Sequence, residues 1–442
     1  MDKYTIKGGK KLKGEVRVIG AKNAALKALV AACLTDKEVI IHNVPLISDF
    51  YVMIDIMKEL GADVKLSGHT VKIQMKSFSQ ISIPLDKAVL ARTSSMFIAP
   101  LLARSGEAII PNPGGCRLGA RPIDRTINGI KQMNVGITYH SEDGYFHAKT
   151  KGLIGTKYHF KKNTHTGTET LILAAVLAHG TTILENAAEE PEIDDIINLL
   201  NRMGANVART GNRQITINGV DKLHGAEYTI SPDRIEVATF AVAALVTGGD
   251  VFIKDANKTD ISLFLERLRL TGAGIEERED GIRFFTTGTL NAVDVTTGIH
   301  PGFLTDWQAL WGFLMTQAKG MSIIHETVFE DKLGYIEDLQ RMGAKVKLFR
   351  PVVKNPEKVY NFNLDDDNPE NFHAVKISGP TALHNAVMTT LDIRAGAAVV
   401  LAALCAKGKS TIFGIEKLDR GYEEFEKRLQ ELGADIKRIK DE

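Results

Sequence analysis

One stretch rich in glycine and proline combines a thiol with cationic side chains. Residues 111–122 read PNPGGCRLGARP, in which Cys116 is followed closely by Arg117 and Arg121. Because proline restricts φ and glycine loosens the backbone, we expect a loop here rather than a helix or a regular strand. Neighbouring positive charge favours the thiolate form of a cysteine. The pattern indicates a nucleophile or acid acting on a small anionic substrate, and the alternative on these residues alone is a surface turn with an inert cysteine.

Three further candidates stand where helices are expected to start. Lys22 lies in GAKNAA, Arg92 in ARTSS and His165 in NTHTGTE. An ammonium group beside the backbone N–H groups of a helix start would make an anion site, and an exposed lysine is the alternative interpretation of Lys22. His165 fits either a phosphate ligand or a capping side chain.

The second half of the chain carries a matching set of charged residues. Asp306, in HPGFLTDWQ, is predicted to be a helix cap or a general base. Arg234 and Arg420 directly follow an aspartate, and Arg394 comes two residues after Asp392. All three are expected at helix starts. Arginine suits bidentate contacts with carboxylate and phosphate, although any one of these residues alone is more simply a solvated arginine.

The elements that would position these residues form an internal repeat. Each copy has a short apolar strand, a polar loop, an amphipathic helix, a glycine suited to a helix C-cap, and a second strand. An Ala-rich helix precedes several copies. The copies recur at roughly 70-residue intervals, with one longer gap. Their helix ends are Gly61-Ala62, Asn134-Val135, Gly204-Ala205, Gly272-Ala273, Gly343-Ala344 and Gly433-Ala434.

Six copies in 442 residues predict an α/β protein with two domains of three repeats each. A repeat scaffold that binds a protein partner is the alternative. It is disfavoured because the loops carry clusters of Lys, Arg, Asp and Cys that a scaffold does not need.

Composition narrows the class of partner. The formal net charge is +1, from 55 basic and 54 acidic residues, which favours neither a nucleic acid nor a membrane surface as partner. The longest apolar runs are too short to span a bilayer, and the first residues do not form a signal peptide. Cys33 and Cys405 lie in apolar helical contexts and are expected in the core. No spacing typical of metal ligands or nucleotide loops is present, so we expect no metal and no cofactor, in a reducing, cytoplasmic setting.

Taken together, these motifs resemble the enolpyruvyl transferases, the family of EPSP synthase, over essentially the whole chain. The cysteine loop is similar to that of the members that act on UDP-N-acetylglucosamine and is absent from EPSP synthase. The motifs that carry the resemblance are residues 20–25, 114–122, 185–192, 233–236, 300–306 and 419–423.

The resemblance implies a particular architecture. It implies two inside-out α/β barrel domains, each of three pseudo-symmetric repeats, with the active site in the cleft between them. One domain would comprise residues 22–233, and the other residues 1–21 together with 234–442.

The resemblance also implies roles for individual residues. Phosphoenolpyruvate would be bound by Lys22, Arg121, Arg394 and Arg420, with Cys116 as the proton donor or the product-release residue. The sugar would be held by Asn23, Asp306 and Val328, with Asp306 as the base. The uridine diphosphate would be held by Arg92, Pro122, Asp124 and the turn at His165, Thr166 and Gly167.

The sequence departs from the family pattern mainly on the nucleotide side. His165 stands in the place of a serine, Arg125 in that of an apolar residue, and Asn163 where some members have lysine. Lys332 replaces an arginine, and an acidic insertion occupies residues 355–372. These departures leave open an acceptor other than UDP-N-acetylglucosamine, or a protein that binds a UDP-sugar as a regulator.

Overall fold

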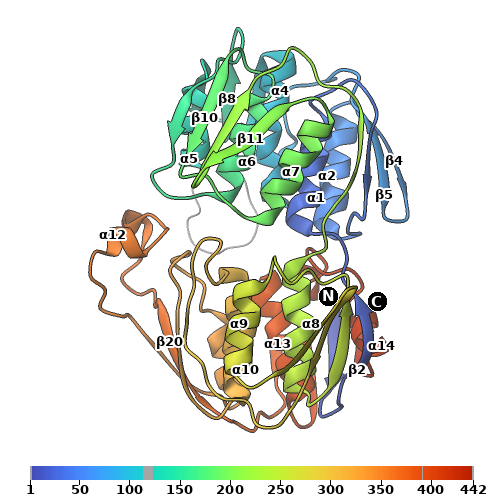
Figure 1. The fold of residues 1–442 in the computed structure, drawn as a ribbon, viewed down its shortest axis with the longest axis vertical. Coiled ribbons are helices and arrows are strands. Elements are labelled where there is room, and N and C mark those ends of the chain that lie inside the picture. The colour runs from blue at the N-terminus through green and yellow to red at the C-terminus, as the bar shows by residue number, and fades with distance from the viewer. Residues whose placement is uncertain (1, 113–122, 391, 441–442) are drawn as a thin grey trace. The chain divides into compact units, whose positions relative to one another are not determined.

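The computed structural model describes residues 2–112, 123–390 and 392–440, and these divide into two compact units. Unit 1 comprises residues 2–19 and 232–440, and unit 2 comprises residues 20–112 and 123–231. The described residues of each unit form three small sheets and a set of helices packed against them (Figure 1).

Unit 2 holds the middle part of the chain. Its strands are β3 (Val39–His42), β4 (Asp63–Ser67), β5 (Thr70–Gln74), β6 (Glu107–Pro111), β7 (Gly136–His140), β8 (Tyr145–Lys149), β9 (Lys157–His159), β10 (Thr181–Glu185), β11 (Asn206–Gly211), β12 (Gln214–Asn218) and β13 (Ala226–Thr229). Its helices are α1 (Lys22–Ala32), α2 (Ser48–Glu59), α3 (Leu85–Ala88), the 3-10 helix η1 (Arg92–Phe97), α4 (Ile98–Ser105), α5 (Asp124–Lys131), α6 (His165–Ala175) and α7 (Pro191–Arg202). The strand orders are β13-β3-β5-β4, β6-β8-β7 and β11-β12-β10-β9.

Unit 1 joins the first residues of the chain to its C-terminal half. Its strands are β1 (Lys3–Lys7), β2 (Lys13–Arg17), β14 (Asp250–Lys254), β15 (Gly274–Arg278), β16 (Gly281–Phe285), β17 (Val295–Thr296), β18 (Gly320–His325), β19 (Lys345–Phe349), β20 (Ala374–Gly379), β21 (Val387–Thr389), β22 (Lys409–Phe413) and β23 (Asp435–Ile439). Its helices are α8 (Arg234–Val246), α9 (Ser262–Leu270), η2 (Thr305–Trp307), α10 (Gln308–Gln317), α11 (Tyr335–Arg341), α12 (Pro356–Val359), η3 (Leu364–Asp366), α13 (Ile393–Cys405), η4 (Ile415–Lys417) and α14 (Phe425–Glu431). The strand orders are β21-β22-β1-β23, β15-β16-β14-β2 and β17-β18-β20-β19.

The two N-terminal strands complete sheets built from the C-terminal half. Strand β1 lies between β22 and β23 and is antiparallel to both, while β2 runs parallel to β14. These residues therefore belong to unit 1 although the chain enters unit 2 directly afterwards.

The repeat predicted from the sequence is visible in how the helices end. The five glycines expected at helix C-termini all have positive φ, from 84° at Gly272 to 104° at Gly61. In the sixth, weaker copy Asn134 takes this conformation with φ of 66°. Asparagine tolerates the left-handed region better than other residues with a side chain, so the sixth copy keeps the same turn.

The Ala-rich helices are the cores of the two units. Helix α1 in unit 2 and helices α8 and α13 in unit 1 are buried on nearly every face, which explains why they lack a polar stripe. Helices α8, α10 and α13 contact one another, with the sheets of unit 1 outside them (Figure 1). Among the described residues, no helix is long and apolar enough to cross a membrane.

The acidic insertion is an ordered excursion that contains the short helices α12 and η3 (Figure 1). Asp367 receives hydrogen bonds or ion pairs from Arg350 (2.5 Å) and His373 (2.9 Å). The ring of Tyr360 stacks on Phe362 with 4.8 Å between centroids. The insertion is thus fixed to strands β19 and β20 by its own side chains.

Candidate active site

Helices α1, α4 and α6 of unit 2 run in the same direction. This brings the predicted site residues at the starts of α1, of the η1–α4 segment and of α6, which are Lys22, Arg92 and His165, to one end of the unit. A cavity of about 480 Å³ is lined by residues at or shortly after the C-terminal ends of α1, α4 and α6, including Thr35, Arg104 and His179. Arg104 also donates hydrogen bonds to the carbonyl oxygens of Cys33 (2.9 Å) and Thr35 (3.1 Å). Because the C-terminal ends meet at this cavity, the starts of α1, of the η1–α4 segment and of α6 share the opposite end of unit 2.

Lys22 is the first residue of α1 and is buried rather than solvated. Only 7% of the residue is exposed, and its ammonium nitrogen lies 2.8 Å from Oδ2 of Asp49 on α2. The simple interpretation of Lys22 as an exposed lysine is therefore wrong. Helix α1 has no side-chain cap, so the ammonium group shares its end of the helix with backbone N–H groups.

His165 opens α6 next to a buried carboxylate. Its Nε2 lies 3.2 Å from Oε1 of Glu169, whose other oxygen lies 3.3 Å from the ammonium nitrogen of Lys27. Glu169 is 0% exposed and Lys27 is 4% exposed. Burial opposes the charged imidazolium, but the Glu169 carboxylate outweighs it, and the net effect is to raise the pKa of His165.

The cap of α6 is Thr164 and not His165. The Thr164 hydroxyl accepts a hydrogen bond from the N–H of Gly167 at 3.2 Å. This removes one of the two interpretations of His165 and leaves its ring available for another role. Asp124 is exposed at the start of α5, and Arg92 is half-buried at the start of η1.

Two departures from the family pattern contact each other at the same helix starts. Arg125 donates from Nη1 to the backbone oxygen of Asn163 at 3.2 Å, and Asn163 donates to the backbone oxygen of Asn186 at 2.9 Å. Asn163 is 3% exposed. Arg125 therefore braces the segment that leads into His165 as part of the structure of unit 2.

Asp306 in unit 1 lies close to two buried cations. Its Oδ1 is 3.9 Å from the ammonium nitrogen of Lys332 and 4.0 Å from Nε of Arg394. Lys332 and Arg394 are 5% and 6% exposed, whereas one third of the Asp306 side chain is accessible. Asp306 supplies no side-chain cap to η2 or α10, so it is not the helix cap considered from the sequence.

Arg394 is held at the start of α13 with part of its guanidinium unused. Asp392 caps the helix by accepting from the N–H groups of Arg394 (2.8 Å) and Ala395 (2.9 Å). The guanidinium carbon lies 5.3 Å from the ring centre of Tyr422. Its Nη1 is buried and has no hydrogen-bond partner among the described residues. A buried donor without a partner costs free energy, which an anionic ligand would recover.

Glu326 joins the segments that carry Asp306 and Val328. This fully buried residue accepts hydrogen bonds from the Thr305 hydroxyl (2.9 Å) and from the N–H groups of Val328 (2.8 Å) and Phe329 (3.1 Å). Burial raises the pKa of Glu326. Glu326 was not identified as a site residue from the sequence, where nothing distinguishes it from other glutamates near strand ends.

Of the two remaining arginines predicted at helix starts in the second half of the chain, only Arg234 lies at one. Arg234 is the first residue of α8, as expected, and its Nη1 lies 3.2 Å from Nδ1 of His300. Arg420 is not at a helix start, because η4 ends at Lys417 and α14 begins at Phe425. It lies in the intervening turn, next to Gly421. The backbone of Gly421 is close to Arg394, because a Cβ added to this glycine would lie 3.8 Å from Nη1 of Arg394.

Three predicted site residues, Cys116, Arg121 and Pro122, lie outside the described residues. Of the other two cysteines, Cys33 is buried in the core as predicted, whereas Cys405 is half-buried against the core of unit 1. Burial raises the pKa of Cys33 to about 12 and that of Cys405 to about 11. Neither is a nucleophile near neutral pH.

Each unit therefore places cationic side chains next to a carboxylate, with Lys22 and His165 in unit 2 and Asp306 beside Lys332 and Arg394 in unit 1. The chain belongs to the EPSP synthase family of enolpyruvyl transferases. The family model described as EPSP synthase (3-phosphoshikimate 1-carboxyvinyltransferase) matches residues 6–429, which confirms the resemblance drawn from the motifs.

Within this family the chain aligns along its full length with proteins named UDP-N-acetylglucosamine 1-carboxyvinyltransferase. It is 41% identical over 441 residues to the one from Magnetococcus marinus, covering 99% of this chain and 100% of that protein. It is 40% identical over 444 residues to the one from Acidobacterium capsulatum, covering 99% and 96%. It is 39% identical over 445 residues to UDP-N-acetylglucosamine 1-carboxyvinyltransferase 1 of Staphylococcus aureus, covering 100% of each protein.

Solved structures confirm the α/β fold of the family. The enolpyruvyl transferase NikO from Streptomyces tendae superimposes with a TM-score of 0.86 at 23% identity, covering 100% of this chain and 99% of that one. An EPSP synthase from Acinetobacter baumannii gives a TM-score of 0.75 at 17% identity, covering 100% of both chains.

Proposed function

We propose that the protein transfers the enolpyruvyl group of phosphoenolpyruvate to the 3-hydroxyl of UDP-N-acetylglucosamine and releases phosphate. This reaction is the first committed step towards peptidoglycan. The observation that carries the proposal is the full-length identity of about 40% to enzymes of that name. The cluster of Asp306, Arg394 and Lys332 supports it, because the reaction needs a carboxylate base beside fixed cations.

The reaction proceeds by addition and elimination. The 3-hydroxyl loses its proton to Asp306 as its oxygen bonds to C2 of the enol, and C3 accepts a proton. The C2–O bond to phosphate then breaks, C3 loses a proton, and the double bond re-forms as a vinyl ether. Cys116 is the proton donor to C3 or assists the release of product.

The residue roles divide by the charge of the group that they bind. Phosphoenolpyruvate carries several negative charges, which buried or half-buried cations bind well. We assign this role to Lys22, Arg121, Arg394 and Arg420. The sugar contacts are Asn23, Asp306 and Val328, and Glu326 positions the last two through its hydrogen bonds. The uridine diphosphate contacts are Arg92, Pro122, Asp124, His165, Thr166 and Gly167.

We also propose that the two units are inside-out α/β barrels of three pseudo-symmetric repeats. The position of the apolar helices supports this, since α1, α8 and α13 are buried and the small sheets lie around them. The domains would then be residues 22–233 and residues 1–21 with 234–442. The pairing of β1 and β2 with strands of the C-terminal half supports this division.

A phosphate-release assay tests the proposed reaction. The protein is incubated with phosphoenolpyruvate and UDP-N-acetylglucosamine, and phosphate release should require both substrates. Asp306→Asn should abolish turnover while the far-UV circular dichroism stays unchanged. Absence of phosphate release with every UDP-hexosamine would refute the proposal, and a near-normal kcat for Asp306→Asn would remove Asp306 as the base.

The departures at His165, Arg125 and Asn163 favour a second candidate, the same transfer to a different nucleotide or UDP-sugar. These residues lie together at the starts of α5 and α6. A panel of UDP-sugars and nucleotides ranked by kcat/KM separates the two candidates. A regulator that only binds a UDP-sugar would release no phosphate with any of them, and the presence of Lys22, Asp306, Arg394 and Arg420 disfavours it.

A further inference from the structure

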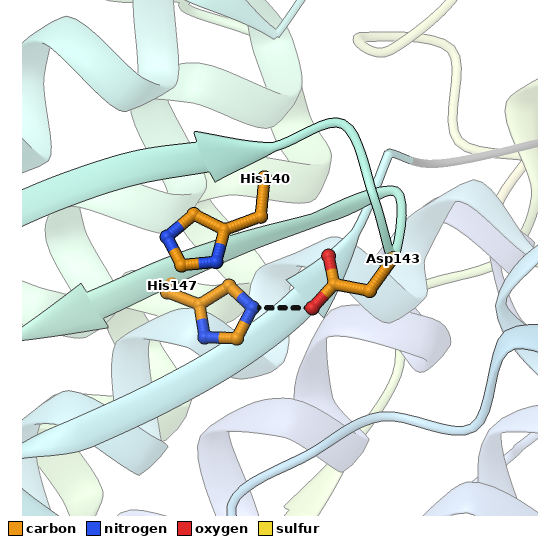
Figure 2. A group of neighbouring side chains, drawn as sticks. All are labelled: His140, Asp143 and His147. Atoms are coloured by element: carbon orange, nitrogen blue, oxygen red, sulfur yellow. Dashed lines mark hydrogen bonds and ion pairs between the residues drawn. The ribbon is translucent and has the colours of Figure 1, made fainter.

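A β-hairpin of unit 2, formed by β7 and β8, gathers two imidazoles and a carboxylate on its two strands and the turn between them. Strands β7 and β8 pair so that His140 is opposite Tyr145 and Thr138 is opposite His147. His140 and His147 are thus diagonal neighbours on one face of the hairpin, within reach of each other. Asp143 lies in the turn between the strands and points towards His147 (Figure 2).

The three side chains are already in contact. Nε2 of His147 lies 2.7 Å from Oδ2 of Asp143. The two imidazole rings stack with 4.1 Å between centroids and 17° between planes. One potential ligand atom from each residue can be chosen so that all three lie within 4.8 Å of one another.

We propose that His140, Asp143 and His147 bind a divalent transition-metal ion, with Zn²⁺ as the representative ion. Two imidazole nitrogens and one carboxylate oxygen form a donor set that suits Zn²⁺, Cu²⁺, Ni²⁺ or Co²⁺. The set does not suit Mg²⁺ or Ca²⁺, which prefer oxygen ligands only. Water would complete the coordination, because His140 and Asp143 are exposed and His147 is half-buried.

The movement needed to form the site is small. Ligand atoms about 2.1 Å from a tetrahedral ion are about 3.4 Å apart, so no pair has to close by more than roughly 1.4 Å. The stacked rings also have to tilt, because the ion must lie near the plane of each imidazole. Exposed side chains on a hairpin can make both adjustments by rotation about χ1 and χ2.

Neighbouring groups already hold two of the three ligands. Nε2 of His140 lies 3.1 Å from the Thr138 hydroxyl, so a proton donated there leaves the lone pair on Nδ1 for the ion. Oδ1 of Asp143 accepts from the N–H of Tyr145 at 2.9 Å, which leaves Oδ2 facing His147. Such second contacts are a usual feature of metal ligands.

The hairpin also anchors the strand that leads to Cys116. Strand β8 pairs with β6, where Tyr145 is opposite Pro111, and the N–H of Asn112 donates to the Gly144 oxygen at 3.4 Å. An ion bound by His140, Asp143 and His147 would hold the turn that receives this hydrogen bond. The proposal stands on the hairpin alone and does not depend on the transfer reaction.

Zn²⁺ binding to the full-length protein tests the proposal. All proteins carry Cys116→Ser, so that the thiolate does not bind zinc, and are freed of metal with a chelator. Zn²⁺ is then titrated in competition with a chromophoric chelator of micromolar affinity. We expect the double substitution His140→Asn and His147→Asn to remove one binding site, and Asp143→Asn to weaken that site at least tenfold.

His159→Gln is the matched control, because His159 is an exposed histidine of the same unit beside a carboxylate, Glu185, at 3.7 Å. This control should bind zinc like the Cys116→Ser parent. Superimposable titrations for the parent and the double variant would overturn the proposal, and so would an equal loss in His159→Gln. Asp143→Asn keeps the shape of the turn, so its effect is interpretable even if the double variant folds poorly.

Discussion

Glu169→Gln removes a buried negative charge that faces two basic groups inside unit 2. The carboxylate is fully buried, with the Lys27 ammonium at 3.3 Å and the His165 imidazole at 3.2 Å. Glutamine has nearly the same shape, so the substitution changes charge with little change in packing. It leaves Lys27, itself 4% exposed, without its counter-charge.

The expected loss of stability is large for a conservative substitution. Breaking one side of a buried ion pair costs about 3–5 kcal/mol, because the remaining charge stays desolvated. For a unit of this size, that corresponds to a fall in Tm of about 10 °C. The matched control is Glu185→Gln, because Glu185 also contacts a lysine, Lys157 at 2.9 Å, and a histidine, but on an accessible surface. We expect little change in Tm for that control.

The substitution should also reverse the protonation behaviour of His165. In the parent, burial lowers the pKa of His165, but Glu169, with a smaller contribution from Glu190, raises it overall. In the variant, burial and the Lys27 charge remain and lower this pKa, opposed by the smaller contribution of Glu190. The parent therefore has a stabilising contribution that is complete below the unfolded pKa of about 6.5 and is lost as the pH rises through the raised folded value. In the variant the contribution is complete above about 6.5 and is lost as the pH falls.

Thermal unfolding between pH 5 and pH 9 measures the change in Tm, and histidine NMR over the same range measures the pKa of His165. The His165→Gln variant identifies the His165 resonance in the spectra. On going from pH 8 to pH 6, this group should stabilise the parent and destabilise Glu169→Gln. Titration of His165 at the same pH in both proteins would contradict the prediction, and so would a loss of Tm equal to that of Glu185→Gln.

Three other substitutions or modifications test unit 1 and the thiols. Glu326→Gln should be at least as stable as the parent at pH 8, because burial raises the pKa of Glu326 and so disfavours its charged form. As the pH falls through that raised pKa towards about 4.3, the stability of the parent should rise relative to that of the variant, which unfolding at a series of pH values measures. Arg394→Lys should raise the KM for phosphoenolpyruvate about 10–100-fold with little effect on the KM for the UDP-sugar, since lysine lacks the planar fork; an unchanged KM would exclude Arg394 from that site. Iodoacetamide at pH 8 should modify Cys116 alone, because the raised pKa values of Cys33 and Cys405 leave about 0.1% thiolate or less, and peptide mapping that found label on either would contradict this.

The repeat was predictable because its signals are local. A glycine or asparagine in the left-handed conformation ends each helix, and an apolar strand precedes it, so both the helix ends and the strands could be located from residue types. The Ala-rich helices expected before several copies include α1, α8 and α13, which the structure buries. Their small side chains let helices pack closely inside sheets of only three or four strands.

The site was predictable only where its residues form part of a motif. Asp306 and Arg394 could be selected from sequence, but their separation of 4.0 Å depends on the packing of α10 against α13. Glu326 and Glu169 act through long-range contacts, so no local pattern marks them. The same is true of His140 and His147, which meet only because β7 and β8 pair in one register.

The environment of His165 bears directly on which acceptor the protein uses. A serine at this position would offer a diphosphate a neutral hydroxyl, whereas an imidazole whose pKa is raised by Glu169 can offer a positive charge. That charge is shared with a buried carboxylate, so its attraction for an acceptor phosphate is weaker than that of a free cation at the same place. In the proposed function, we therefore expect the pair of His165 and Glu169 to bind the nucleotide diphosphate without a second strong cation. With UDP-N-acetylglucosamine as the proposed acceptor, the departure at His165 would change how the diphosphate is held and would keep the diphosphate site.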